Sequence, residues 1–186
     1  MIIILEGVDC GGKGWMAERL LKSIPNCYYL KHGNKPANNS EGEIAKLHIS
    51  YNTMLKTYNE AIRPNGGNVI FDRFYPSELV YGSVVRRYNI NLTRDEALIN
   101  YYKELESKVN QEPHLYIEIF ADKADILKRM EIRGEDYLEQ ELVSPVLESY
   151  EAFFETTSLT NKYRLRSSQT NVENIVGWVR AHGVSI

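Results

Sequence analysis

Short apolar runs recur along the chain, separated by longer stretches in which apolar residues return every three or four positions. Each run has the length and the content of β-branched or aromatic residues that are typical of a buried strand. A fifth run, at residues 27–31, is weaker than the other four. The clear runs are residues 2–6, 68–72, 114–120 and 162–167.

The stretches between these runs have the periodicity of amphipathic helices. One of them, residues 138–156, contains Pro145, which predicts an interruption of that helix. Strands that alternate with helices of ten or more residues require crossover connections, so we expect an α/β fold in which a five-stranded parallel sheet has helices on both faces. The other helical patterns are residues 13–24, 42–62, 76–88, 93–110, 123–132 and 171–182.

Length and composition fit one such domain. The chain has 186 residues with no repeat and no shift in composition, so we expect a single domain over residues 1–186. Its 22 Lys and Arg residues and 25 Asp and Glu residues give a net charge of −3, which argues against a nucleic-acid partner. A small anionic ligand needs only a few well-placed cations, so this class of ligand remains open.

The cysteines and the apolar runs bear on the location of the protein. Cys10 and Cys27 form neither a disulfide framework nor a metal-ligand cluster, so we expect reduced thiols in a cytoplasmic protein. The first residues lack the basic segment of a signal peptide, and no apolar run is long enough to cross a bilayer. We therefore expect no membrane partner.

A glycine-rich loop follows the first expected strand. Residues 5–14 read LEGVDCGGKG and match the phosphate-binding pattern G-x-x-x-x-G-K-[ST] at Gly7, Gly12 and Lys13, whereas Gly14 stands at the hydroxyl position. Backbone N–H groups and the N-terminus of the next helix would cradle the β-phosphate of a nucleotide, and Lys13 would bridge its β- and γ-oxygens. The residues predicted to bind the nucleotide here are Gly7, Val8, Asp9, Cys10, Gly11, Gly12, Lys13, Gly14 and Trp15.

Acidic residues stand where parallel strands end. The segment NVIFDRFYPSELVYG closes a strand with Asp72 and Arg73, and Glu6 closes the first strand. Ligands of such sheets bind beyond the carboxyl ends of the strands. We therefore expect Glu6, Asp72 and residues 120–122 to share one cleft.

Two later segments complete the pattern. ILKRMEIRGED places Arg129 and Arg133 four residues apart, on one face of a helix. RSSQTNVENIV follows the last expected strand and carries Ser168 and Gln169.

In this order, over nearly the whole chain, these segments resemble the thymidylate kinase family of P-loop nucleoside monophosphate kinases. The resemblance implies a three-layer P-loop kinase fold with a short lid at about residues 129–142. It also implies ATP and Mg²⁺ as cofactors, small-molecule nucleotides as partners, and a homodimer, which nothing in the residues themselves requires. The content of Asn and Tyr is typical of an AT-rich phage or viral source.

The resemblance implies roles on the donor side of the site. Lys13 and the loop amides would hold the ATP phosphates. Arg129 and Arg133 would be lid arginines that close over the transferring phosphoryl group, with Arg129 also a nucleotide-binding residue. Ser168 and Gln169 would border the donor adenine.

It likewise implies roles on the acceptor side. Asp9 would contact the acceptor sugar, Arg73 would hold its phosphate, and Asp72 would place Mg²⁺, usually through water. Ser77 and Tyr81, on the helix after the Asp-Arg pair, would line the substrate site. The catalytic set implied by the resemblance is Lys13, Asp9, Asp72, Arg73, Arg129 and Arg133.

Each assignment has a structural alternative. Asp72 and Arg73 could form a plain ion pair at a strand end, and Asp9 could cap its own turn. Tyr81 could belong to the core. The two helix arginines could lie on a solvated face and pair with neighbouring glutamates.

The chain departs from the family at two points. Gly14 and Trp15 replace two small hydroxyl residues, of which the first normally coordinates Mg²⁺, so a water held by Asp72 would have to fill that position. The arginine and glutamine that accompany thymine recognition in the family are also missing. The base of the acceptor therefore stays open.

The leading hypothesis is an ATP-dependent (deoxy)nucleoside monophosphate kinase, which transfers the γ-phosphoryl group of Mg-ATP to a monophosphate such as dTMP. A deoxynucleoside kinase is the nearest alternative and would need a carboxylate as general base, for which Glu6 and Asp9 are the candidates. The second alternative is a nucleotide-binding protein whose catalysis is weakened by Gly14.

Overall fold

The computed structural model describes residues 1–31, 41–86, 96–134 and 138–182. Within them, five strands form one sheet whose neighbouring strands are all parallel, in the order β2-β3-β1-β4-β5. The strands are β1 (Ile2–Glu6), β2 (Cys27–Lys31), β3 (Asn68–Asp72), β4 (His114–Phe120) and β5 (Lys162–Arg166). The expected five-stranded parallel sheet is confirmed, and the weakest run of the sequence forms the edge strand β2.

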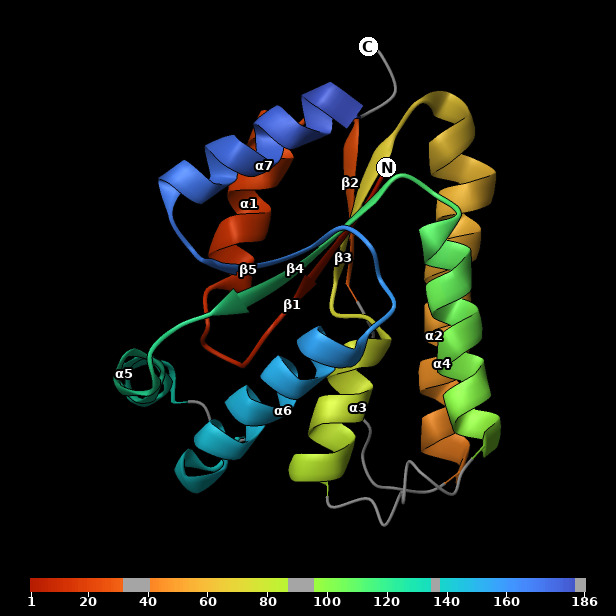
Figure 1. Ribbon diagram of the computed structural model, residues 1–186. Helices are drawn as coiled ribbons and strands as arrows, with labels where there is room; N and C mark the ends of the chain where they lie inside the picture. Colours follow the sequence, from red (N-terminus) through yellow and green to blue (C-terminus); the bar gives the residue numbers. More distant parts are fainter. Residues whose placement is uncertain (32–40, 87–95, 135–137, 183–186) are drawn as a thin grey trace.

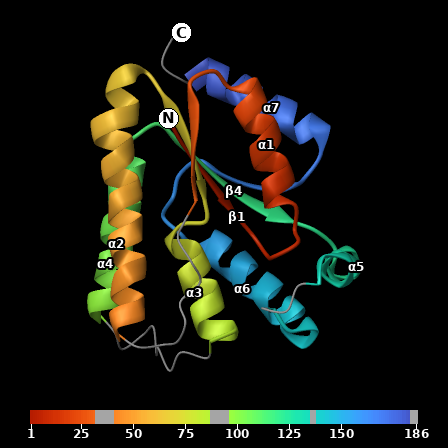
Figure 2. The ribbon, with the colours of Figure 1, turned by 180° about the vertical axis from the view of Figure 1, so that it is seen from behind.

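Helices cover both faces of this sheet. In the described part of the chain they are α1 (Lys13–Ser23), α2 (Glu41–Thr57), α3 (Tyr75–Val84), α4 (Glu96–Asn110), α5 (Lys123–Arg133), α6 (Val143–Thr156) and α7 (Gln169–His182). The short turns η1 (Tyr58–Ile62) and η2 (Arg63–Asn65) extend α2, and η3 (Gln140–Leu142) precedes α6. α1 and α7 lie on one face, α2, α3, α4 and α6 lie on the other, and α5 stands past the end of β4 (Figures 1 and 2).

The central strand β1 shows why the strands read as continuous apolar runs. Ile2 and Ile4 pack into a cluster with residues of α2 and α4, whereas Ile3 and Leu5 pack into a second cluster with residues of α1 and α7. Successive side chains of a strand point to opposite faces, and helices cover both faces here. Every residue of β1 is therefore buried.

Pro145 does not interrupt the helix expected over residues 138–156. α6 begins at Val143, so Pro145 lies in the first turn, where its missing N–H removes no intrahelical hydrogen bond. The prediction of a break was wrong because it placed the proline in the interior of the helix.

Some sequence expectations fall on residues outside the described ranges. The end of the helix expected over 76–88 and the start of the helix expected over 93–110 fall within residues 87–95, which lie outside the described residues. The lid expected at about 129–142 includes residues 135–137, which also lie outside them. Of the helices that are described, none combines the length and the apolar character needed to span a membrane.

The carboxyl ends of the strands lie along one edge of the sheet. The register places Asp72 of β3 beside Leu5 of β1 and beside Lys31 of β2, and places Glu118 of β4 beside Glu6. Because the chain leaves each strand at this edge, the connections to α1, α3, α5 and α7 begin there. The candidate site is built on these connections.

On the face opposite to α1, the buried Glu106 of α4 joins several elements. Its carboxylate accepts hydrogen bonds from the hydroxyl groups of Tyr75 and Thr157 and from the backbone N–H of Ser158 at 3.2 Å. These partners belong to the start of α3 and to the connection between α6 and β5. Glu106 therefore holds α4 against two parts of the chain that are distant in sequence.

We expect Glu106→Ala to lower the free energy of unfolding by about 2–4 kcal/mol, because it leaves several buried donors without an acceptor. Glu106→Gln keeps the shape and one carbonyl acceptor, and should cost about half as much. Urea unfolding followed by circular dichroism measures both values. Equal stabilities of Glu106→Ala and the wild type would contradict this role.

Candidate active site

The loop between β1 and α1 approaches its neighbours so closely that two of its positions require glycine. Gly7 has φ 132° and Gly12 has φ 111°, in the left-handed region that side chains disfavour. A Cβ added to Gly7 would lie 2.1 Å from the carbonyl oxygen of Ile119, and one added to Gly12 would lie 2.3 Å from Ser167 Oγ. The loop is thus pressed against the ends of β4 and β5.

Lys13 is the first residue of α1 and points into the site. Its Nζ donates hydrogen bonds to the carbonyl oxygens of Gly7 at 2.7 Å and Val8 at 2.9 Å, so the side chain folds back over the loop. Burial and, to a smaller extent, the charge of Arg73 lower the pKa of Lys13 to about 8. The ammonium group is therefore poised to gain stability from an anion.

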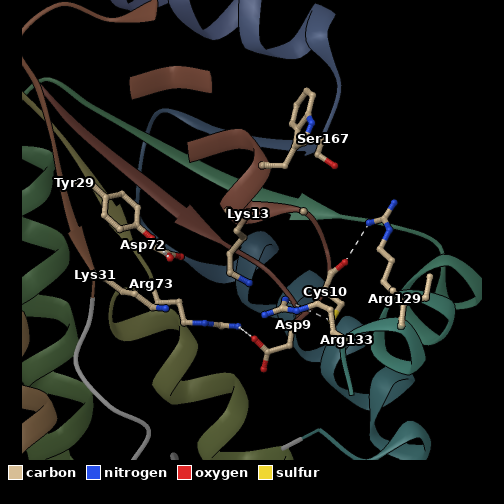
Figure 3. Close-up of a pocket in the computed structure, with 14 residues that line it drawn as sticks. Asp9, Cys10, Lys13, Tyr29, Lys31, Asp72, Arg73, Arg129, Arg133 and Ser167 are labelled. Atoms are coloured by element: carbon tan, nitrogen blue, oxygen red, sulfur yellow. Dashed lines mark hydrogen bonds and ion pairs between the residues drawn. The ribbon is translucent and has the colours of Figure 1, made fainter. Parts of the chain in front are cut away.

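A cavity of about 770 Å³ opens above this loop. Figure 3 shows Lys13 between two groups of side chains, with Asp72 and Arg73 on one side and Arg129 and Arg133 on the other. The residues that line the cavity are Asp9, Cys10, Gly12, Lys13, Gly14, Trp15, Tyr29, Lys31, Asp72, Arg73, Arg129, Ile132, Arg133 and Ser167.

Arg73 is held in place from several directions. Its backbone has φ 68°, an unfavourable conformation for a residue with a side chain. Nη2 donates to Asp9 Oδ1 at 2.5 Å, and Nη1 donates to Ser77 Oγ at 2.7 Å and to the Tyr150 hydroxyl at 2.9 Å. The guanidinium also lies over the ring of Tyr81, 4.8 Å from its centroid. Asp9 and Arg73 thus enter the cavity as one fixed unit.

Glu6 lies beneath this unit and does not reach the cavity. It is fully buried and accepts hydrogen bonds from the backbone N–H of Phe74 at 2.6 Å, from the Ser77 hydroxyl, and from the Tyr150 hydroxyl at 3.2 Å. Burial raises the pKa of its carboxyl group. Of the residues expected to share one cleft, Asp72 lines it, whereas Glu6 supports it from below.

Asp72 presents one free carboxylate oxygen. Its Oδ2 accepts a hydrogen bond from the Tyr29 hydroxyl, while Oδ1 is buried and has no hydrogen-bond partner among the described residues. A buried, unpartnered carboxylate oxygen at a phosphate-binding loop suits a hard cation such as Mg²⁺. The described residues contain no group of three His, Cys, Asp or Glu side chains that could hold a metal by themselves.

The two arginines of α5 contact the loop between β1 and α1. Arg129 Nη1 donates to the carbonyl oxygen of Cys10 at 3.1 Å, and Arg133 Nη1 lies 3.7 Å from Cys10 Sγ. Their four-residue spacing places both on the same side of α5. Ile132, between them in sequence, is 75% exposed and also lines the cavity.

Ser168 and Gln169, expected to border the donor adenine, are not among the residues that line the cavity. Ser168 Oγ accepts the backbone N–H of Asn171 at 3.3 Å, Gln169 donates to Glu173 at 3.2 Å, and the preceding Ser167 lines the cavity instead. The hydrogen bonds of Ser168 and Gln169 thus lie within the first turns of α7.

Ser77 and Tyr81, expected to line the substrate site, are both buried, contact Arg73, and are not among the residues that line the cavity. Trp15 lines the cavity and also packs against the α1–α7 cluster, with the Arg19 guanidinium 3.9 Å from its ring centroid. The loop residues Gly7, Val8 and Gly11 shape the turn without lining the cavity.

Sequence reasoning missed Tyr29 and Lys31, which line the cavity from the end of β2. The signal that could have found them is their place at the carboxyl end of a parallel strand. The strand itself is expected from the sequence, but no motif marks the tyrosine and the lysine at its end.

The charge of the lining differs from that of the whole protein. Of the described residues that line the cavity, five are cationic and two are carboxylates, although the chain has a net charge of −3. Lys31 is the last residue of β2 and Arg73 follows β3, Arg129 and Arg133 lie on α5 after β4, and Lys13 lies between the two pairs. The arrangement offers two places for anionic groups, one on each side of Lys13.

No family model matches the sequence. The chain is 31% identical over 149 residues to the SPbeta prophage-derived uncharacterized protein YorR of Bacillus subtilis (strain 168). The aligned region covers 80% of this chain and 79% of YorR. The crystal structure of Bacillus subtilis YorR in complex with phosphorylated GDP matches with a TM-score of 0.72 and 26% identity, over 97% of this chain and 96% of that chain.

Two structures with known activities share the fold. Deoxyadenosine kinase from M. mycoides with bound dATP matches with a TM-score of 0.60 and 18% identity, over 97% of this chain and all of that chain (100%). Thymidylate kinase from Ehrlichia chaffeensis matches with a TM-score of 0.56 and 14% identity, over 97% of this chain and 96% of that chain. The expected P-loop kinase fold is therefore confirmed.

The lowered pKa of Lys13 predicts a pH-dependent affinity for ATP. Phosphate binds the protonated amine, and the free protein loses this proton as the pH rises through about 8. Above that pH binding must take up a proton, so the Kd for ATP should rise by up to about tenfold per pH unit. Titration calorimetry from about pH 7 to about pH 9.5, at constant ionic strength, measures this dependence.

Lys13→Met is the matched control for this titration. It should bind ATP more weakly at all pH values and lose the rise in Kd between about pH 8 and 9.5, because its side chain has no proton to lose. A wild-type Kd that stays constant over this range would contradict the assignment.

Proposed function

The chain belongs to the family of YorR, and from this premise and the geometry of the site we propose that it transfers the γ-phosphoryl group of Mg-ATP to a (deoxy)nucleoside monophosphate. The single observation that carries the proposal is the placement of two pairs of cations on opposite sides of Lys13. One pair suits the donor phosphates and the other suits a phosphate on the acceptor.

The assignment of sides follows from the loop. A phosphate-binding loop holds the donor phosphates over the N-terminus of its helix, here α1. Arg129 and Arg133 contact the loop residue Cys10, so they belong to the donor and to the transferring group. Lys31 and Arg73 lie on the other half of the sheet, where the acceptor would approach Lys13.

The state of the carboxylates favours a phosphorylated acceptor over a nucleoside. A 5′-hydroxyl needs a general base, whereas an acceptor phosphate is already ionised and nucleophilic. Glu6 is enclosed below the site, and Asp9 enters the cavity as an ion pair with Arg73, so neither candidate base faces the cavity as a carboxylate without a charged partner. Two cations on the acceptor side would also be poorly matched to a neutral nucleoside.

The residues of the chain would then divide the work as follows. Arg73, fixed by Asp9 and Ser77, would bind the acceptor phosphate in one orientation, and Asp9 would be close enough to accept a hydrogen bond from the sugar. Lys13, Arg129 and the loop amides would stabilise the charge that spreads over the equatorial oxygens of the transferring group.

Mg²⁺ fits this site through Asp72. Its Oδ1, which accepts no hydrogen bond from the described residues, would hold the ion directly or through water, and the ion would neutralise charge on the donor phosphates. Gly14 supplies no hydroxyl ligand. The placement of the ion would therefore rest more on Asp72 than on the loop.

Product analysis tests the proposal. Purified protein is incubated with Mg²⁺ and ATP or GTP, and separately with each nucleoside monophosphate, deoxynucleoside monophosphate and nucleoside. GTP is included because the YorR structure contains phosphorylated GDP. Diphosphate formed from one or a few monophosphates supports the proposal. Phosphorylation of nucleosides alone, or nucleotide binding with no product from any acceptor, would overturn it.

We expect Arg73→Lys to act on the acceptor and not on the donor. Lysine keeps the charge but cannot reach Asp9, Ser77 and a phosphate together. The KM for the monophosphate should rise by about 10- to 150-fold, the range for losing one hydrogen bond to a charged group, while the KM for ATP stays within about threefold.

Arg63→Lys is the matched control for this variant, because Arg63 is half-exposed and pairs with Glu112 outside the cavity. It should leave both KM values unchanged. An equal rise in the two KM values of Arg73→Lys would show that the arginine supports the loop as a whole.

A further inference from the structure

Tyr29 reaches the cavity from the side of the sheet opposite to α5 and contacts Asp72 there. It lies on the edge strand β2, is 38% exposed, lines the cavity, and donates its hydroxyl to Asp72 Oδ2. The contact ties the edge strand β2 to the end of β3. It leaves Asp72 Oδ1 as the oxygen without a hydrogen-bond partner among the described residues.

The register of the sheet explains why a tyrosine is needed for this contact. Tyr29 stands beside Ile70, two residues before Asp72, and Lys31 stands beside Asp72 itself. Alternate residues of a strand share a face, so Tyr29 and Asp72 lie on a diagonal of about 7–8 Å between adjacent strands. A phenol ring spans that diagonal, whereas a serine or threonine hydroxyl would fall short.

The missing hydroxyl at Gly14 gives the contact its importance. Asp9, the other carboxylate that lines the cavity, is bound to Arg73. A divalent ion would therefore depend on Asp72 Oδ1 as its protein ligand in the cavity. A single carboxylate can rotate about its side-chain torsions, unless a second group holds one of its oxygens.

We propose that Tyr29 is a positioning residue for the metal, which fixes Asp72 through Oδ2 so that Oδ1 faces the ion, and thereby offsets the loss of the hydroxyl at position 14. The inference rests on the proposed function only in assuming that a nucleotide and Mg²⁺ bind here. Partners that orient a ligand in this way change metal affinity by about 10- to 100-fold when they are removed.

The test measures nucleotide binding and not turnover. Titration calorimetry gives the Kd of a non-hydrolysable ATP analogue in EDTA, and a titration with Mg²⁺ gives the concentration that produces half of the Mg²⁺-dependent gain in affinity. Tyr29→Phe removes the hydroxyl and keeps the ring, so its thermal unfolding should stay close to that of the wild type. Tyr28→Phe is the matched control, because its neighbour Tyr28 is 50% exposed and does not line the cavity.

For Tyr29→Phe we expect the half-saturating Mg²⁺ concentration to rise by about 10- to 100-fold, with the Kd in EDTA unchanged within about twofold. Tyr28→Phe should match the wild type in both values. Gly14→Ser supplies a hydroxyl, and a Cβ at this position meets no atom within 4 Å. In the Gly14→Ser background, Tyr29→Phe should therefore raise the half-saturating concentration by no more than about threefold.

Three results would overturn the inference: an unchanged Mg²⁺ dependence in Tyr29→Phe, an equal loss of affinity in EDTA, or the same effect with and without Gly14→Ser. A wild-type protein whose nucleotide affinity ignores Mg²⁺ would overturn it as well. A protein that binds nucleotide with the expected Mg²⁺ dependence but phosphorylates no monophosphate would refute the proposed function and leave this inference intact.

Discussion

Gly7 has no room for a side chain, because a Cβ at this position would lie only 2.1 Å from the carbonyl oxygen of Ile119. This close approach of the first loop to the end of β4 sets the rest of the site. It places the N-terminus of α1 and Lys13 over the centre of the sheet edge. It also brings α5, which follows β4, within reach of the loop, where Arg129 contacts Cys10. A larger residue at Gly7 would separate the loop from both.

Around this loop the protein concentrates cations in a chain whose net charge is negative. Such a concentration is unfavourable unless the cations have polar partners, and the structure shows these partners for Arg73 and Lys13. Arg73 is paired with Asp9 and supported by Ser77 and Tyr150, while Lys13 rests on two carbonyl oxygens. Preorganised charge of this kind costs little reorganisation when an anionic group enters.

Gly14 and Tyr29 both bear on the proposed metal site. The loop lacks the side chain that would contact a metal, and an edge strand supplies a hydroxyl to the carboxylate that remains. The two positions lie on different elements, and both line the cavity together with Asp72. Whether a loop that lacks this hydroxyl can still support metal binding therefore depends on residues outside the loop.

Much of this protein follows from its sequence. Strand and helix positions could be predicted because apolar periodicity reflects which faces are buried, and the loop and the Asp72–Arg73 pair could be found because their neighbours along the chain define them. The burial of Glu6, the contact of Arg129 with Cys10, the place of Ser167 in the cavity lining, and the bond from Tyr29 to Asp72 could not. Each depends on the order β2-β3-β1-β4-β5, which joins residues far apart in the chain, and local pattern carries no record of that order.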